Sequence, residues 1–196
     1  MRDDRLRLGR RAVGASIAVL LLFGTTACER LAEVPVLSER NAKSDATLDE
    51  LREWVSKEID AVIEVTGVAH EWVAQGSNGV RWTEERERIF EGQRISMCSF
   101  HSEEVNPAAV RISLKTDSLE QDPFLLLERV RQLWNERGWE VGNLPGSGQG
   151  QTQTLKIRAD REDGAMATLF AADGAGGRML GLMVESACSN DPSVAR

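Results

Sequence analysis

The 196-residue chain contains few of the residues from which enzymes build metal and redox sites. It has two histidines and three cysteines, and no two cysteines form a Cys-x-x-Cys pair, the spacing typical of zinc and redox-active sites. Neither a Gly-x-Ser-x-Gly nucleophile elbow nor a Gly-Lys-Ser/Thr phosphate loop occurs. The sequence therefore names no reaction, and we predict no cofactor and no bound metal.

The chain also lacks an apolar run long enough for a comfortable membrane-spanning helix. Its longest such run, residues 12–23, is shorter than the roughly 20 apolar residues that such a helix needs. Five arginines precede this run, and the small residues 24–27 follow it. A basic start, a short apolar core and small residues before a cleavage point are the layout of a secretory signal peptide. We therefore expect an exported protein.

Cys28 directly follows the small residues, and this arrangement resembles the bacterial lipobox. In that motif the cysteine becomes the lipidated first residue of the mature protein. Thr26 and Ala27 fit the motif, whereas Thr25 stands where an aliphatic residue is usual. The alternative is ordinary cleavage, which would leave Cys28 as a free thiol. We predict lipidation, because an exposed free thiol is a liability in an exported protein.

The leader divides the chain into four expected segments. These are a lipoprotein signal peptide (1–27), a polar tether (28–46), one folded domain (47–190) and a tail (191–196). Lipoproteins of this kind carry two or three acyl chains such as palmitate, enough for stable attachment to a membrane. We therefore expect the protein on the outer face of the cell membrane. Arg10 and Arg11 leave both the general secretory and the twin-arginine export routes open.

Basic residues are scarce after the signal peptide. Five of the 24 basic and two of the 31 acidic residues precede Cys28, so the remaining 169 residues carry 19 basic and 29 acidic side chains and a net charge of −10. Nucleic-acid binding depends on basic patches that neutralise phosphates, so this charge argues against a nucleic-acid partner. It also argues against an electrostatic grip on anionic lipid.

Cys98 and Cys188 remain as the possible intramolecular pair once Cys28 is assigned to lipid. An oxidising compartment favours a disulfide between them. Closing a loop of about 90 residues would stabilise the fold by roughly 4 to 5 kcal/mol, through the entropy removed from the unfolded chain. A redox-active or metal-binding pair is the alternative, and we favour the structural disulfide.

Two amphipathic helices are predicted. Thr47 and Glu50 form a capping box at the start of the first, apolar residues then recur at spacings of three and four, and Gly67 offers a stop. Asp122 caps the second helix, which begins with a proline and ends at Gly138.

Alternation of apolar and polar residues predicts strands elsewhere. The segments are 93–100, 110–115 and 154–158, followed by 165–172 and 179–187 after turns at 163–164 and 173–177. In the last segment, Cys188 shares parity with Leu180 and Leu182 and is expected to face the helices. Cys98 is opposite in parity to Met97, so either that strand bulges or its other face is also covered.

The predicted order is helix, two strands, helix, one short strand and a three-stranded meander. Helices on one face of a mainly antiparallel sheet are the natural solution for this order. We predict a two-layer α+β fold with two helices on one face of the sheet. The disulfide would then join the first strand to the last.

The chain resembles small actinobacterial envelope lipoproteins of the LppA-like kind, many of them uncharacterised. The residues that carry this resemblance are Cys28 with its leader, Met97-Cys98-Ser99-Phe100, Gly138-Trp139 and Ser186-Ala187-Cys188. The resemblance implies an architecture and a location, and it carries no catalytic residue.

Few other positions invite a chemical interpretation. His70 and His101, with Glu103 and Glu104, are residue types that bind zinc, but their spacing matches no ligand motif and we expect solvated side chains. The charged run 83–88 is likewise expected to be a solvated surface. The Pro- and Gly-rich residues 142–150 are expected to form a connecting loop, with a partner-binding loop as the alternative.

Trp72 and Trp82 flank the Gly-rich segment 75–79 and are the candidate binding residues. Partly exposed rings there could stack on a sugar or a peptide, whereas core packing is the commoner fate of tryptophan. The leading functional hypothesis is a non-enzymatic lipoprotein that binds an envelope protein or ligand at the cell surface. The alternative is an envelope hydrolase with carboxylate or histidine chemistry, for which paired carboxylates in a cleft, or His70 beside His101, would be the sign.

Overall fold

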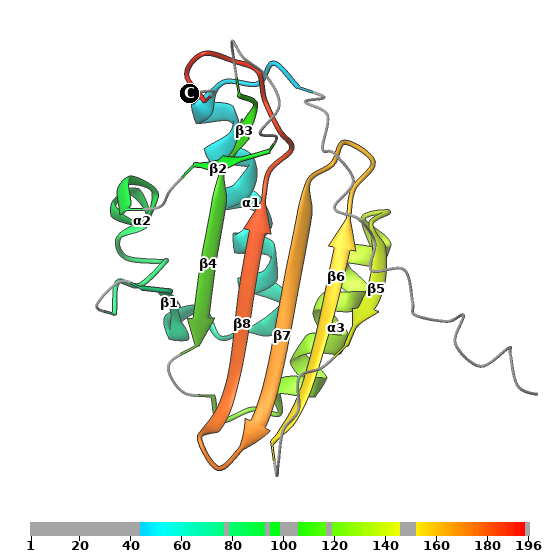
Figure 1. Cartoon of the computed structure of the whole chain (residues 1–196). Coiled ribbons are helices and arrows are strands. Elements are labelled where there is room, and N and C mark those ends of the chain that lie inside the picture. Colours follow the sequence, from blue (N-terminus) through cyan, green and yellow to red (C-terminus); the bar gives the residue numbers. More distant parts are fainter. Residues whose placement is uncertain are drawn as a thin grey trace, which may run out of the picture. The chain divides into compact units, whose positions relative to one another are not determined.

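The computed structural model describes residues 44–76, 79–92, 95–98, 106–116, 119–145 and 152–194. They form an antiparallel sheet of six strands in the order β1-β4-β8-β7-β6-β5 (Figure 1). The strands in that order are β1 (Trp72–Ala74), β4 (Arg111–Thr116), β8 (Gly177–Glu185), β7 (Met166–Gly174), β6 (Gln153–Asp160) and β5 (Glu140–Leu144). A small second sheet pairs β2 (Ser96–Met97) with β3 (Ala108–Ala109).

Helices α1 (Leu48–Thr66) and α3 (Pro123–Glu136) cover one face of the main sheet (Figure 1). A short helix α2 (Arg86–Gly92) lies on the β4 side of that sheet, and a 3-10 turn η1 (Ala69–Glu71) joins α1 to β1. The predicted α+β fold with a mainly antiparallel sheet is confirmed. No helix in the described part of the chain is long and apolar enough to cross a membrane.

The ends of both long helices lie where the sequence places them. The Glu50 carboxylate accepts a hydrogen bond from the Thr47 backbone N–H at 2.8 Å, which completes the capping box of α1. Gly67 ends α1 in the left-handed region, at φ 70°, a conformation that glycine adopts without steric cost. Asp122 caps α3 by accepting from the Phe124 N–H at 2.8 Å.

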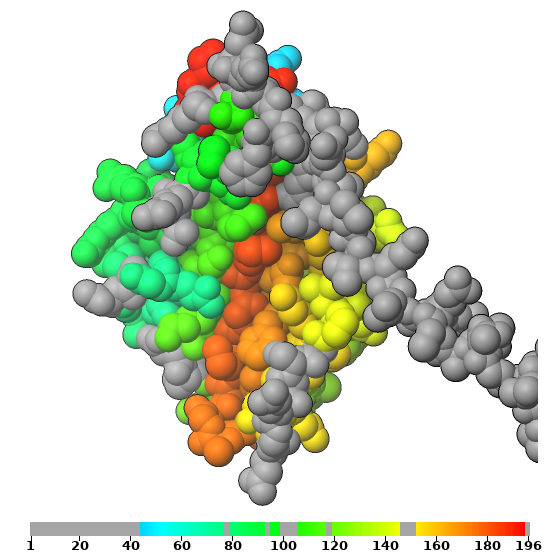
Figure 2. All heavy atoms as spheres, in the orientation of Figure 1, coloured from blue at the N-terminus to red at the C-terminus, as the bar shows by residue number. Residues whose placement is uncertain are grey.

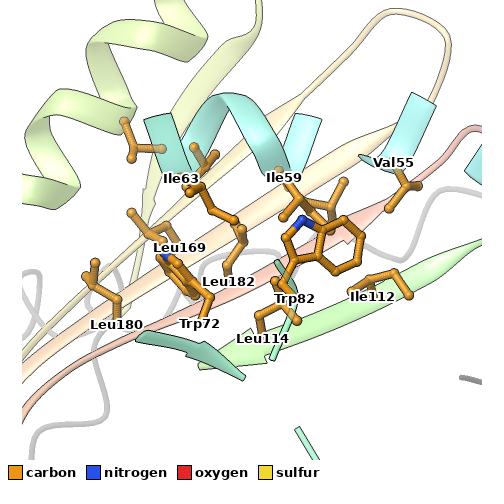
Figure 3. Close-up of a cluster of buried hydrophobic side chains, with 14 of the residues drawn as sticks. Val55, Ile59, Ile63, Trp72, Trp82, Ile112, Leu114, Leu169, Leu180 and Leu182 are labelled. Carbon is orange, nitrogen blue, oxygen red and sulfur yellow. The ribbon is translucent and has the colours of Figure 1, made fainter. Parts of the chain in front are cut away.

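The core lies between the helices and the sheet. Apolar residues at helical spacing on α1 meet the inward-facing residues of β4, β7 and β8 (Figure 3). The side chains labelled there are Val55, Ile59, Ile63, Trp72, Trp82, Ile112, Leu114, Leu169, Leu180 and Leu182. Burial of this apolar surface is the main stabilising contribution to the fold.

Some predicted strand boundaries were wrong. Of the predicted strand 93–100, the structure describes residues 95–98, and among these Ser96 and Met97 form a strand that belongs to the small sheet. The turn at 173–177 narrows to two residues, because Gly174 and Gly177 already pair. Strand β8 ends at Glu185, before the predicted end at residue 187, so Cys188 lies beyond the alternating residues of the strand. Strand β1 and helix α2 were not predicted, since β1 has three residues and α2 begins within a densely charged run.

The disulfide between Cys98 and Cys188 is present, with Cα atoms 6.2 Å apart and a sequence separation of 90. It does not join the first strand of the main sheet to the last. Instead it joins the residue after β2 to the segment after β8. The Cys98 N–H also donates to the Pro107 carbonyl at 2.9 Å, so the disulfide fastens the small sheet to the C-terminal segment.

Both ends of the predicted domain reach further than expected. Ser44, placed in the tether, bridges to Ser189, and its carbonyl accepts from the Asn190 N–H at 3.1 Å. Val194, placed in the tail, is fully buried in the core. The Leu48 N–H donates to the Ser193 hydroxyl at 2.9 Å. These contacts tie both segments to the domain.

Candidate binding pocket

A pocket of about 540 Å³ lies between the first turns of α1, helix α2, the small sheet and the start of β4. Its lining residues are Leu48, Arg52, Phe90, Glu91, Gly92, Ile95, Met97, Ala108, Val110 and Arg111. Pockets that bind small molecules commonly measure roughly 300 to 1,000 Å³ and are mostly apolar with a few polar groups. This pocket fits that description in size, and its lining combines apolar side chains with three charged ones.

The apolar part of the lining combines fixed and adaptable side chains. Phe90 and Val110 are buried against the core, whereas Met97 is 52 % exposed. A methionine is flexible and polarisable, so it can adapt its shape to a bound apolar group. An exposed methionine beside a buried aromatic ring thus provides an apolar surface that a ligand can reach.

Two arginines and one glutamate, Glu91, line the same pocket, and the two arginines differ in their ion-pair partners. Arg111 forms an ion pair with Glu185, whose side chain is only 3 % exposed. The Arg52 guanidinium lies over the Phe90 ring, 5.6 Å from its centroid. Within the described residues, the only carboxylate within 4 Å of Arg52 is that of Asp49, at 3.9 Å. Arg52 is therefore the pocket cation that is least engaged by an anion.

A second, smaller hollow of about 290 Å³ lies on the sheet face opposite the helices. Figure 2 looks onto this face, where β7 and β8 run between β4 and β6. Phe170, Met179 and Met183 supply its apolar lining and Lys156 its charge. The pocket beside α2 is the larger of the two and contains two arginines, so it is the stronger candidate.

A buried carboxylate lies elsewhere, between α1 and α3. Glu58 accepts hydrogen bonds from Trp134 Nε1 at 3.2 Å and from an Arg137 guanidinium nitrogen at 2.9 Å. Burial raises the pKa of Glu58, and the positive charge of Arg137 opposes this shift. Glu58 lines neither hollow, so its bonds serve to join the two helices.

Beside Glu58, three tryptophans form what we call the tryptophan cluster: Trp54, Trp134 and Trp139. Trp139 stacks on each of the other two rings with centroids 6.1 Å apart. The Arg161 guanidinium lies over two of the rings, 5.2 Å from the centroid of Trp54 and 5.8 Å from that of Trp139. Arg161 also pairs with Asp163 at 2.9 Å, so its charge is compensated.

The candidate binding residues Trp72 and Trp82 are both fully buried, so the stacking hypothesis for them was wrong. Residues 72–74 pair with residues 80–82: the Trp82 N–H donates to the Trp72 carbonyl at 3.0 Å and the Ala74 N–H to the Val80 carbonyl at 2.9 Å. Trp82 Nε1 donates to Asp60 at 2.8 Å. Both rings point into the core (Figure 3), which is the packing alternative.

Other predicted positions lie partly within and partly outside the described residues. His70 is exposed, and its carbonyl accepts a hydrogen bond from Arg81. Residues 142–144 belong to strand β5 rather than to a loop. No group of three metal-binding side chains occurs among the described residues. The predictions that lie outside the described residues are the signal peptide (1–27), tether residues 28–43 with Cys28, Ser99, Phe100, His101, Glu103, Glu104 and loop residues 146–150.

Sequence reasoning missed the pocket because its lining comes from separate segments. They lie within residues 48–52, 90–92, 95–97 and 108–111, which are far apart in the sequence. Ile89 and Phe90 are adjacent apolar residues directly after the charged run, and both are buried. They were the one local signal that this run leads into a packed helix.

No protein-family model matches the chain, and the comparisons find no significantly similar curated protein or solved structure. The resemblance to LppA-like envelope lipoproteins therefore stays a prediction.

Proposed function

We propose that the chain is an exported envelope lipoprotein whose folded domain binds a ligand without transforming it. In this proposal Cys28 carries acyl chains, palmitate among them, and holds the protein on the outer face of the membrane. The observation that carries the binding function is the pocket of about 540 Å³ with an apolar wall and two arginines. Its size and lining are those of a small-molecule site.

The composition of the pocket favours binding over hydrolysis. Covalent catalysis uses a nucleophile next to a base, and general acid–base catalysis uses a positioned proton carrier. Among the described residues, the lining supplies one carboxylate, Glu91, together with arginines and apolar side chains. Arginine stays protonated and serves to bind anions. These groups can hold and orient a ligand.

The expected anchor agrees with such a role. The 16 residue steps from Cys28 to Ser44 span at most about 55 Å when fully extended. The start of the folded domain would thus stay within that reach of the membrane. A tethered binding domain samples the space beside the membrane without being part of the bilayer.

The anchor is tested by expressing Cys28→Ala in a bacterium that processes lipoproteins. Wild-type protein should sediment with membranes and incorporate an alkyne-labelled fatty acid, and the variant should do neither. Thr25→Leu is the matched control, because it restores the aliphatic residue usual at that place and should keep both properties. Membrane-bound, unlabelled Cys28→Ala would overturn the anchor proposal.

The pocket is tested with Nile red, a neutral dye whose fluorescence rises in an apolar site. A Cβ added at Gly92 meets no atom within 4 Å, so Gly92→Trp can extend from the pocket lining without a backbone clash. Gly176, at the β7–β8 turn, is equally open, and Gly176→Trp is the matched control. We expect the dye to bind wild type and the control but not Gly92→Trp. Equal binding by all three would exclude the pocket as the binding site.

A further inference from the structure

We infer that the pocket takes an amphipathic anion, with its apolar group against the Phe90 wall and its single negative charge on Arg52. This inference rests on the proposed binding function and names the chemical class of the ligand. It comes from a comparison of the arginines that stack on aromatic rings in this fold.

Two of these arginines have their charge compensated at hydrogen-bond distance. Arg86 lies over a tryptophan ring and donates to both carboxylate oxygens of Asp60, at 2.7 and 2.9 Å. Arg161 lies over two tryptophan rings and pairs with Asp163 at 2.9 Å. In both places a ring lies beneath the guanidinium and a carboxylate oxygen lies within hydrogen-bond distance of it. Neither arginine lines the pocket.

Arg52 has the ring but not the close carboxylate. Its guanidinium lies over Phe90, while the Asp49 oxygen is 3.9 Å away, beyond hydrogen-bond distance. The Asp49 side chain is 94 % exposed, so water screens this pair strongly. A guanidinium carries five donors in a planar fork that matches the oxygens of a carboxylate or a phosphate. An anion in the pocket would supply for Arg52 what Asp60 supplies for Arg86.

The other charges in the pocket favour one negative charge over several. Arg111 is already neutralised by the buried Glu185, so it adds little attraction for a second anionic group. Glu91 lines the same pocket and would repel a multiply charged headgroup. The remaining lining is mainly apolar and can hold an aliphatic chain. A monoanionic headgroup on an acyl chain, from a free fatty acid or from a phosphate monoanion, combines these properties.

The test is calorimetric titration of the full chain carrying Cys28→Ala, which keeps every described residue and removes the expected lipid anchor. Three ligands with the same chain and different head charges, dodecanoate, dodecanol and dodecyltrimethylammonium, are used below their micelle concentrations. We expect dodecanoate to bind about tenfold or more tightly than the other two, since one charge-assisted hydrogen-bonded contact accounts for that ratio. Dodecyl phosphate is titrated as well, near pH 5 where it is a monoanion, so that binding of a phosphate headgroup can be distinguished from binding of a carboxylate.

Arg52→Gln should weaken dodecanoate binding about tenfold and leave dodecanol binding unchanged. Lys57→Gln is the matched control, because it removes one positive charge from the exposed side of the same helix and should change neither affinity. Arg52→Lys keeps the charge without the planar fork and should fall between wild type and Arg52→Gln. It also serves as the second variant if Arg52→Gln folds poorly.

The outcomes separate the two proposals. Equal affinities for dodecanoate and dodecanol, both abolished by Gly92→Trp, would overturn the anion inference and leave the binding pocket in place. Binding of none of these ligands by wild-type protein that still binds Nile red would also overturn only the anion inference. Dodecanoate and Nile red binding that Gly92→Trp does not reduce would overturn both.

Discussion

The pocket and the tryptophan cluster each contain an arginine that lies over an aromatic ring, and helix α1 contributes residues to both. In the cluster, Arg161 covers stacked rings and Asp163 compensates its charge at 2.9 Å. In the pocket, Arg52 covers Phe90 and the nearest compensating oxygen is 3.9 Å away. The cluster is closed by its own side chains, whereas the pocket keeps about 540 Å³ of space.

This difference separates stabilisation from binding. Beside the cluster, Glu58 accepts hydrogen bonds from Trp134, whose ring is fully buried, and from Arg137, so these polar groups have their partners inside the protein. Contacts of this kind contribute to the free energy of folding. The pocket leaves a donor and an apolar surface available, which costs some stability and permits binding.

The largest effect is expected from removing the disulfide with Cys98→Ser and Cys188→Ser together. Opening a loop of about 90 residues should lower the free energy of unfolding by roughly 4 to 5 kcal/mol. For a domain of this size the melting temperature should fall by about 10 °C or more, measurable by circular dichroism. A melting temperature equal to that of wild type would show that the cross-link does not restrain the unfolded chain.

The same variant also tests the pocket, because Cys98 directly follows the β2 residue Met97. Without the disulfide, the β2 side of the pocket is attached to the domain mainly through the two residue pairs between β2 and β3. We therefore expect Nile red affinity to fall even at temperatures where the domain stays folded. Unchanged affinity would mean that the position of β2 beside the pocket does not depend on the disulfide.

The next largest effect is expected in the cluster. Trp134→Ala removes a fully buried ring that stacks on Trp139 and donates to Glu58, and should lower the free energy of unfolding by about 3 to 5 kcal/mol in urea. Nile red binding by the fraction that remains folded should be unchanged. A loss of dye binding in the folded fraction would couple the two regions and contradict the comparison.

Glu58→Gln should make stability less dependent on pH. Because burial raises the pKa of Glu58 in the folded state, its favourable contribution is present at acid pH and is lost as pH rises from about 4.3 through the folded pKa. Relative to wild type, the variant should be about equally stable near pH 3.5 and gain stability by pH 7. A glutamine oxygen can still accept from Trp134. A difference that is constant between these pH values would argue against the shift.

The smallest effects come from two matched arginine substitutions. Arg161→Gln should destabilise the fold by about 1 kcal/mol, since it removes a cation over two rings and an ion pair. Arg52→Gln should change stability by less than about 0.5 kcal/mol, because its carboxylate partner is distant and exposed. Chemical denaturation of both variants side by side measures the difference. A larger loss of stability from Arg52→Gln than from Arg161→Gln would show that the charge of Arg52 is the better compensated of the two.

Much of the fold could be predicted because its signals are local. The caps at Thr47 and Asp122 mark the starts of α1 and α3, and period-two alternation marks β4 and β6. The disulfide followed from counting cysteines. The sequence reasoning failed where an element is too short to show a period, as in β1, or begins within a charged run, as in α2.

The pocket lay beyond prediction for a different reason. Leu48 and Val110 are remote in sequence, and no spacing rule joins them to Phe90. Trp72 and Trp82 attracted attention because they flank a Gly-rich segment, but their backbones pair with each other and both rings are buried in the core. Whether an aromatic ring is exposed depends on tertiary packing, which local composition does not specify.

The claim that the pocket beside α2 is the binding site is tested most directly by an amide NMR titration of the folded domain with dodecanoate. Our proposal predicts that shift changes saturate and concentrate at residues that line the pocket, such as Arg52, Phe90 and Gly92. The amide signals of Trp54, Trp134 and Trp139 should not shift. Changes centred on these tryptophans or on the β7–β8 face, or no saturable change at all, would contradict it.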